Sequence, residues 1–306
     1  MTDRPWLGSY PPGVPADIDP SQYSSLVGLM DESFSKYADR TAYSFMGKDV
    51  SYASVDRHSR AFAGYLQGLG LVKGDRVAVM MPNCPQYPIA VAGILRAGLI
   101  LVNVNPLYTP RELEHQLQDS GAKTIVIMEN FAATLQHCLA STPVQHIVLG
   151  AMGDRLGLLK GTLVNYVVRK VKKLVPAYEL PQAVRFNAAL GEGAARGVKT
   201  PAIGPDDVAV LQYTGGSTGV SKGAVLLHRN LIANVLQSEA WNDPVMQKVP
   251  AGEQPTSVCA LPLYHIFAFT VNMMLGLRTG AKVILIPNPR DMAATLKELS
   301  KHTFHS

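Results

Sequence analysis

The stretch YTGGSTGVSKG, from Tyr213 to Gly223, is the most informative part of this 306-residue chain. It combines four glycines and four serine or threonine hydroxyls with one lysine, Lys222. Glycines allow the backbone to approach a ligand closely, and successive backbone N–H groups can form an anion-binding nest. The hydroxyls add hydrogen-bond donors, and the lysine adds a mobile positive charge. The stretch therefore predicts a loop that binds phosphate.

This loop differs from the P-loop of the common nucleotide triphosphatases. That motif has Gly-Lys followed directly by Ser or Thr at the start of a helix, whereas here the order is Ser221-Lys222-Gly223. The flanking segments 208–213 and 224–227 are apolar and predict short strands. We therefore expect the tip of a hairpin. A flexible surface turn is the alternative, and the density of hydroxyls together with the lysine favours phosphate binding.

Two segments resemble the adenylate-forming enzymes, which include acyl-CoA synthetases, luciferases and peptide-synthetase adenylation domains. Residues 213–230, YTGGSTGVSKGAVLLHRN, resemble the phosphate-loop signature of that family, and residues 261–267, LPLYHIF, resemble a second family motif. Shorter matches upstream are Ser51-Tyr52, residues 74–77, residues 103–106 and Tyr108-Thr109. The resemblance covers the chain from about Pro5 onward and is strongest to bacterial long-chain fatty-acid–CoA ligases. Most relatives carry Thr where this chain has Ser217, which keeps the hydroxyl.

The resemblance implies a reaction in two steps. A fatty-acid carboxylate attacks the α-phosphate of Mg·ATP to give acyl-adenylate and pyrophosphate, and the thiolate of coenzyme A then displaces AMP. ATP, Mg²⁺ and coenzyme A are thus the implied cofactors and co-substrates. Lys222 is expected to screen the departing pyrophosphate, and Ser217 to contact Mg²⁺ or phosphate. The implied ATP-binding residues are Tyr213, Thr214, Gly215, Gly216, Ser217, Thr218, Gly219, Val220, Ser221, Lys222, Gly223 and Ala224.

The second motif supplies the expected site for the acid. His265 is a candidate catalytic residue that donates a hydrogen bond to the carboxylate, and Tyr264 is expected to help position it. The alternative for a single histidine is a buried side chain satisfied by backbone groups. In long-chain relatives an aromatic residue shortly after this histidine gates the acyl tunnel. Phe267 and Phe269 are the candidates, Phe269 having the better spacing, and core packing is the alternative role.

Helical and strand patterns alternate along the chain and predict an α/β fold with parallel sheets flanked by helices. We expect a first subdomain at residues 1–200, with an extended arm at residues 5–20, and a second subdomain at residues 205–306. Helices are expected at 26–37, 52–69, 87–96, 111–119, 131–139, 231–241, 267–277 and 296–302, and strands at 76–80, 99–102, 124–128, 147–149, 208–213, 224–227, 258–261 and 282–286.

The alternation breaks at residues 151–204, and one segment within the break is amphipathic. Residues 162–175 carry seven Leu or Val residues that fall on one side of an ideal helix, with Arg169, Lys170, Lys172 and Lys173 on the other. Such a helix can lie in the interface of an anionic membrane. The alternative is a surface helix whose apolar side packs on the protein and whose lysines face water.

Composition limits the remaining possibilities. The chain is 47% hydrophobic and 17% charged, with a net charge of +5, and it carries no recognised nucleic-acid-binding motif. Cys84, Cys138 and Cys259 are far apart, so we expect neither a disulfide framework nor a zinc site. No signal peptide and no membrane-spanning run of apolar residues is recognisable. We expect a cytoplasmic protein, with peripheral attachment to the inner face of the membrane as a further possibility.

The chain ends at Ser306, before the positions of the family's motifs for adenine, ribose and the adenylation lysine. We therefore expect the N-terminal part of a longer ligase, inactive by itself. The alternative is a non-catalytic, membrane-associated fragment that binds nucleotide or lipid. We also consider a homodimer, because exposed core surface would promote association.

Overall fold

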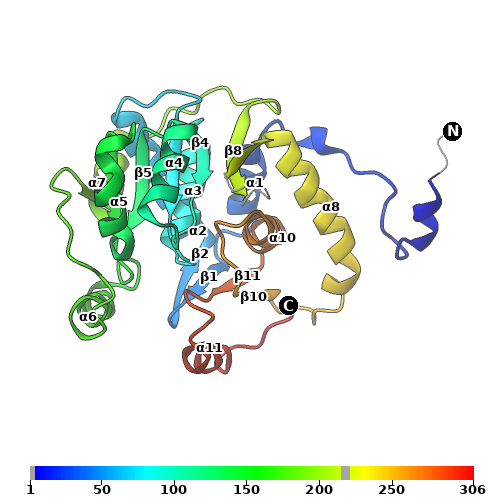
Figure 1. Cartoon of the computed structure of the whole chain (residues 1–306). Coiled ribbons are helices and arrows are strands. Elements are labelled where there is room, and N and C mark those ends of the chain that lie inside the picture. Colours follow the sequence, from blue (N-terminus) through cyan, green and yellow to red (C-terminus); the bar gives the residue numbers. More distant parts are fainter. Residues whose placement is uncertain (1–3, 215–220) are drawn as a thin grey trace.

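Two sheets organise the structure, a computed structural model that describes residues 4–214 and 221–306 (Figure 1). The strand order is β7-β6-β5-β3-β4-β8-β9 in the larger sheet and β10-β11-β1-β2 in the smaller one. The larger sheet comprises β3 (Arg76–Met80), β4 (Ile100–Asn103), β5 (Thr124–Met128), β6 (His146–Gly150), β7 (Val184–Arg185), β8 (Val208–Thr214) and β9 (Lys222–Leu227). The smaller sheet comprises β1 (Thr41–Phe45), β2 (Lys48–Ser51), β10 (Thr256–Cys259) and β11 (Lys282–Leu285).

Strand pairing is parallel throughout both sheets except for the pairs β8–β9 and β1–β2, which are antiparallel. The α-helices are α1 (Leu26–Lys36), α2 (Tyr52–Gly68), α3 (Gln86–Arg96), α4 (Pro110–Ser120), α5 (Ala132–Cys138), α6 (Leu158–Tyr166), α7 (Phe186–Arg196), α8 (His228–Met246), α9 (Ile266–Ala268), α10 (Leu275–Thr279) and α11 (Met292–Leu299). Short 3-10 helices span Pro5–Ser9, Pro20–Gln22, Glu129–Phe131 and Leu139–Ser141, and π-helical turns span Val167–Val171 and Phe269–Met274. The predicted α/β class with parallel sheets is confirmed.

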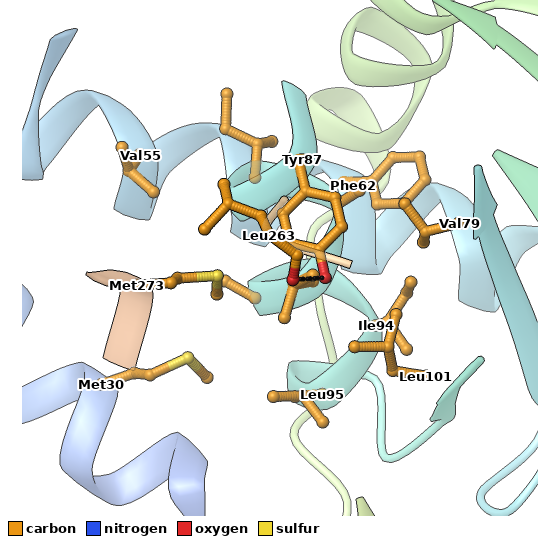
Figure 2. Packing of buried hydrophobic residues seen from close by; sticks show 14 of the residues in the cluster. Met30, Val55, Phe62, Val79, Tyr87, Ile94, Leu95, Leu101, Leu263 and Met273 are labelled. Atoms are coloured by element: carbon orange, nitrogen blue, oxygen red, sulfur yellow. Dashed lines mark hydrogen bonds between the residues drawn. The ribbon is translucent and has the colours of Figure 1, made fainter. Parts of the chain in front are cut away.

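The central strand β3 separates two cores. Val77 and Val79 face the core that contains residues of α2, α3 and α7, whereas Ala78 and Met80 face the core of α4 and α5. This alternation shows that helices cover both faces of the larger sheet, as strands buried on both sides require. Figure 2 shows part of the first core, where Leu263 and Met273 from late in the sequence pack near Tyr87.

The sheets do not follow the sequence order. β1 pairs with β11, with Tyr43 opposite Val283, so a strand near the N-terminus belongs to the smaller sheet. Conversely, β8 and β9 extend the larger sheet. The predicted boundary between residues 1–200 and 205–306 therefore does not coincide with a boundary between sheets, and separate subdomains at those limits stay a prediction.

The N-terminal arm is not simply extended. Residues 5–9 form a 3-10 helix that stands away from the sheets, beside the far end of α8 (Figure 1). Tyr10 packs edge-on against Trp241 of α8, with 5.1 Å between the ring centres.

The predicted helix at residues 162–175 is wrong in its limits and in its faces. α6 begins at Leu158, continues as the π-helical turn, and ends where Lys173 adopts a left-handed conformation with φ of 51°. Val168 is buried, whereas Leu163 and Val171 are exposed, so the residues expected on one apolar side point in different directions.

Two anchors turn α6 in this way. A Cβ on Gly161 would overlap the carbonyl oxygen of Gly153, so only glycine permits this close approach of the backbones. Further along, Arg169 forms a two-bonded ion pair with the buried Glu129, at 2.8 Å for each bond, and Arg185 adds a third bond at 2.9 Å. Removing Arg169 from this pair would leave the buried charge of Glu129 uncompensated. Arg169 is therefore held by the protein and does not join the exposed lysines of the segment.

The first residue of α8 connects this helix to α1. Nδ1 of the buried His228 accepts a hydrogen bond of 3.1 Å from the backbone N–H of Leu26, at the start of α1. Burial lowers the pKa of His228 to about 4. The imidazole is therefore neutral in the folded protein at neutral pH, as its role as acceptor requires.

Acidification should weaken the fold through His228. Its pKa rises from about 4 in the folded chain to about 6.5 in the unfolded chain, so the unfolded state binds the proton more tightly. The free energy of unfolding should fall as the pH is lowered from 6.5 to 4, by up to about 1.4 kcal/mol for each pH unit. Urea unfolding at pH 7.5 and pH 5 measures this loss. His228→Asn, which keeps an acceptor but does not titrate, should reduce it, and an unchanged loss would contradict the assignment.

Candidate functional site

A pocket of about 220 Å³ lies where the neighbouring parallel strands β4 and β8 end. Ligands of open α/β sheets bind outside the carboxyl ends of the strands, which is where this pocket lies. The residues that line it are Asn103, Asn105, Tyr108, Gln212, Tyr213, Thr214, Tyr264, His265 and Ile266. It therefore brings the predicted phosphate loop and the LPLYHIF segment to one place. Another cavity, of about 120 Å³, lies near Asn242 and Thr256 and contains none of the predicted site residues.

The phosphate loop is the connection of an antiparallel pair of strands. Thr214 at the end of β8 is paired with Lys222 at the start of β9, and Tyr213 is paired with Gly223. This pairing confirms the predicted hairpin, in which Ala224 lies on β9. The predicted phosphate-binding residues Gly215, Gly216, Ser217, Thr218, Gly219 and Val220 lie outside the described residues.

Helix α4 supports both strands of this hairpin. The hydroxyl of Tyr213 donates to the Asp119 carboxylate at 2.5 Å, and burial raises the pKa of this tyrosine, which keeps it protonated as a donor. The Nε2 atom of His115 lies 3.1 Å from the carbonyl oxygen of Ser221, and the Ser221 hydroxyl donates to the Thr214 carbonyl at 2.9 Å. The described ends of the loop are thus held on a regular helix.

Lys222 is exposed, and within the described residues no acidic side chain lies at ion-pair distance from it. Its charge is therefore available to an anion. The described lining of the neighbouring pocket is uncharged apart from the titratable His265. Over residues 4–214 and 221–306 there is no group of three or more His, Cys, Asp or Glu side chains that could hold a metal ion.

His265 is the residue that caps the start of α9. Its Nδ1 accepts a hydrogen bond of 3.3 Å from the backbone N–H of Phe267. A neutral imidazole that accepts at Nδ1 carries its proton on Nε2. The exposed His265 can therefore donate from Nε2 to an anionic ligand in the pocket, beside the half-buried Tyr264.

The two phenylalanine candidates for a tunnel gate differ in burial. Phe269, the preferred candidate, begins a π-helical turn and is fully buried in the core. Phe267 is 55% exposed. Phe269 thus has a packing role in this structure, and a gating role for it stays a prediction.

Five pocket residues were not among the predicted site residues, and one of them, Ile266, directly follows His265. Asn103 ends β4, Asn105 and Tyr108 follow it, and Gln212 lies within β8. Gln212 interrupts the apolar run of residues 208–213, and a buried amide in such a strand needs a hydrogen-bond partner. A polar residue in this apolar run is the sequence signal that could have identified Gln212 as a candidate site residue.

A model of the AMP-binding enzyme family matches residues 30–306. A long-chain-fatty-acid–CoA ligase of Escherichia coli O157:H7 is 54% identical over 300 residues, covering 98% of this chain and 53% of that protein. A long-chain-fatty-acid–CoA ligase of Bacillus subtilis (strain 168) is 34% identical over 303 residues, covering 99% of this chain and 53% of that protein. The chain spans about half the length of the curated relatives it matches.

Solved structures share the fold. An anthranilate CoA ligase in complex with anthranoyl-AMP has a TM-score of 0.74 at 18% identity, over 93% of this chain and 50% of that one. A long-chain-fatty-acid-CoA ligase from Archaeoglobus fulgidus has a TM-score of 0.72 at 24% identity, over 96% of this chain and 53% of that one.

The three cysteines should be unreactive in the folded chain. All are buried, and burial raises the pKa of Cys84 and Cys259 to about 12 and that of Cys138 to about 11. Because the thiolate is the reactive form, a thiol reagent such as DTNB should label the native chain slowly and label three thiols per chain rapidly in denaturant. Rapid labelling of any one thiol at neutral pH in the native chain would contradict this burial.

Proposed function

Because this chain belongs to the AMP-binding enzyme family, we propose that it carries the ATP- and acid-binding region of a long-chain fatty-acid–CoA ligase. The observation that carries the proposal is the pocket between the phosphate hairpin and the Tyr264–His265 pair. The substrate class comes from relatives up to 54% identical that are long-chain-fatty-acid–CoA ligases. The match to that relative covers 98% of this chain.

In the proposed first step, a carboxylate oxygen of the fatty acid attacks the α-phosphorus of ATP, and the bond to pyrophosphate breaks. Two anions must approach each other, so positioning and charge stabilisation carry most of the catalysis. The hairpin would supply Lys222 and the hydroxyl of Thr214 to the phosphates, while Nε2 of His265 would donate to the carboxylate.

Mg²⁺ is proposed to arrive with ATP, held by its phosphates and by water, which this ion retains when it binds proteins. The proposed contact from the protein, the hydroxyl of Ser217, lies outside the described residues. In the second step the thiolate of coenzyme A would attack the acyl carbon, and AMP would leave.

The alternative function is a non-catalytic, membrane-associated fragment that binds nucleotide or lipid. A coupled assay with ATP, fatty acid and coenzyme A separates the two, run on residues 1–306 and on the full-length gene product. Acyl-CoA formation supports the ligase, and ATP or fatty-acid binding without turnover in both proteins supports the alternative.

We further propose an anionic membrane surface as a partner. The outer face of α6, formed by Leu158, Leu159, Leu163 and Tyr166, is exposed to 86, 87, 62 and 59% respectively. The opposite side of the helix is attached to the protein through Gly161. α6 lies at the periphery of the molecule, at the lower left of Figure 1. Among the described residues no helix combines the length and apolar composition needed to cross a bilayer.

Charge supports this choice of partner. Lys170, Lys172 and Lys173 are exposed directly after the outer face of α6. An apolar helix face beside a lysine cluster suits the boundary between acyl chains and anionic headgroups, where each basic residue contributes about 1 kcal/mol. A surface that was merely solvated would not need four large apolar side chains on one face.

Lys222→Ala should lower kcat/KM for ATP in the full-length gene product by about 10²- to 10³-fold, the usual cost of losing one well-placed donor in such a site. Ser217→Ala should act in the same direction. Steady-state kinetics with varied ATP measures the change, and Lys248→Ala, which removes an exposed lysine outside the site, is the matched control. Unchanged ATP kinetics in both loop variants would mean that the loop is only a turn.

Replacing Lys170, Lys172 and Lys173 with Glu should abolish co-sedimentation with vesicles that contain phosphatidylglycerol, because the reversed charges repel the headgroups. Leu159→Glu with Leu163→Glu should weaken binding as well, at every salt concentration. Wild-type binding should fall as salt rises. Val72→Glu alters an exposed apolar side chain outside this face and should have no effect. A wild-type chain that fails to sediment at low salt would refute the membrane proposal.

A further inference from the structure

The segment from Cys259 to His265, here called the crossing segment, runs from the end of β10 to the start of α9. It passes from the smaller sheet to the pocket at the edge of the larger one. Cys259 and Leu263 are fully buried, although the segment beyond β10 belongs to no strand. Buried backbone N–H and C=O groups outside a sheet must find other partners, since an unpaired one costs as much as a lost hydrogen bond.

Asn83 supplies most of these partners for the first half of the segment. It lies in the loop after β3 and is only 3% exposed. Its Nδ2 donates to the carbonyl oxygens of Cys259 at 3.0 Å and Leu261 at 2.9 Å, and its Oδ1 accepts from the N–H of Leu263 at 2.8 Å. The side-chain amide of Asn83 thus supplies the donor and acceptor groups that the backbone of a neighbouring strand would otherwise provide.

A relay of three buried side chains holds the second half. The hydroxyl of Tyr87 lies 2.9 Å from the carbonyl oxygen of Leu263, the contact drawn as a dashed line in Figure 2, and 2.6 Å from Oδ1 of Asn103. Nδ2 of Asn103 donates to Oε1 of Gln212 at 3.0 Å, and Nε2 of Gln212 donates to the carbonyl oxygen of Tyr264 at 3.1 Å. The relay connects α3, β4 and β8 to the residue that precedes His265.

These contacts reach the pocket from two sides, because Asn103 and Gln212 of the relay line it, whereas Asn83 and Tyr87 lie outside it. Tyr264 and His265 also line the pocket. An effect of Asn83 on a ligand must therefore pass through the backbone of the crossing segment, and an effect of Tyr87 must pass through that backbone or through Asn103. Neither side chain carries a charge, so an effect through a long-range field is not available to them.

We propose that Asn83 and the Tyr87–Asn103–Gln212 relay are positioning residues that set the place of His265 against the carboxylate of the acid substrate. This inference rests on the proposed function, in which Nε2 of His265 meets that carboxylate. The phosphate hairpin is held separately, by α4. Disturbing the crossing segment should therefore affect the acid far more than ATP.

The kinetic test uses Asn83→Ala and Tyr87→Phe in the full-length gene product. Tyr87→Phe keeps the buried ring and removes only the hydroxyl, so it preserves the packing of the core. Both variants should raise KM for palmitate, Asn83→Ala by about 10-fold or more, since misplacements of about 1 Å cost up to about 100-fold. KM for ATP should stay within about twofold of wild type.

Gln86→Met is the matched control. Gln86 is also fully buried, and its Nε2 donates to the carbonyl oxygen of Ala151 at 2.8 Å. This variant removes the same kind of amide–carbonyl bond without touching the crossing segment. It should lower the thermal midpoint, by less than Asn83→Ala because Gln86 makes one hydrogen bond to the backbone and Asn83 makes three, and it should leave KM for palmitate unchanged.

A second measurement does not depend on turnover. In proton NMR of residues 1–306, the imidazole signal of His265 is assigned by its loss in His265→Gln. Asn83→Ala should shift this signal, and Gln86→Met should not. An unshifted signal, or KM values for palmitate and ATP that rise equally, would overturn the positioning role. If the wild-type gene product shows no fatty-acid-dependent turnover, the ligase proposal fails, and the NMR result alone decides whether Asn83 positions His265.

Discussion

Beyond Cys259, where β10 ends, the backbone of the crossing segment has to satisfy its buried polar groups where no neighbouring strand is available. A buried carbonyl or N–H left unpaired costs about 1–3 kcal/mol, so a segment with several such groups cannot lie between two sheets without partners. The loop after β3, helix α3 and strands β4 and β8 each contribute one side chain to this task. The pocket at the edge of the larger sheet is consequently defined by the same hydrogen bonds that join the two sheets.

Local patterns were enough for much of the fold. The limits of β3 and β5 agree with those expected from their apolar runs, and the glycine-rich loop proves to connect an antiparallel pair. The short strands β1 and β2 were missed, and the exchange of strands between sheets could not be foreseen, because both depend on pairing between distant residues. Asn83 was missed for a related reason. An asparagine after a strand looks like an ordinary turn residue, and its buried partners come from residues 259–263.

The segment around α6 shows where an ideal helical projection fails. An ideal projection rotates by 100° per residue and does not say which side of the helix packs on the protein. In the structure, Gly161 and Arg169 determine that side. A π-helical turn after Tyr166 then changes the angular step along the segment. The result exposes leucines upstream of the amphipathic stretch, at residues 158 and 159, that the sequence pattern had not included.

The parallel pairing of β1 with β11 has a consequence for biosynthesis. Strand β1 leaves the ribosome among the first residues, but its partner, at 282–285, is translated almost at the end of this chain. At about 5–20 residues per second, the β1–β2 hairpin waits tens of seconds with one edge unpaired. Contacts of such long sequence separation slow folding and expose strand edges to aggregation. In the larger sheet, strands β3 to β6 are close in sequence, so they can pair soon after they are translated. Slower translation would therefore lengthen the interval with an unpaired edge more for β1 than for β4, whose partner β8 is translated earlier than β11.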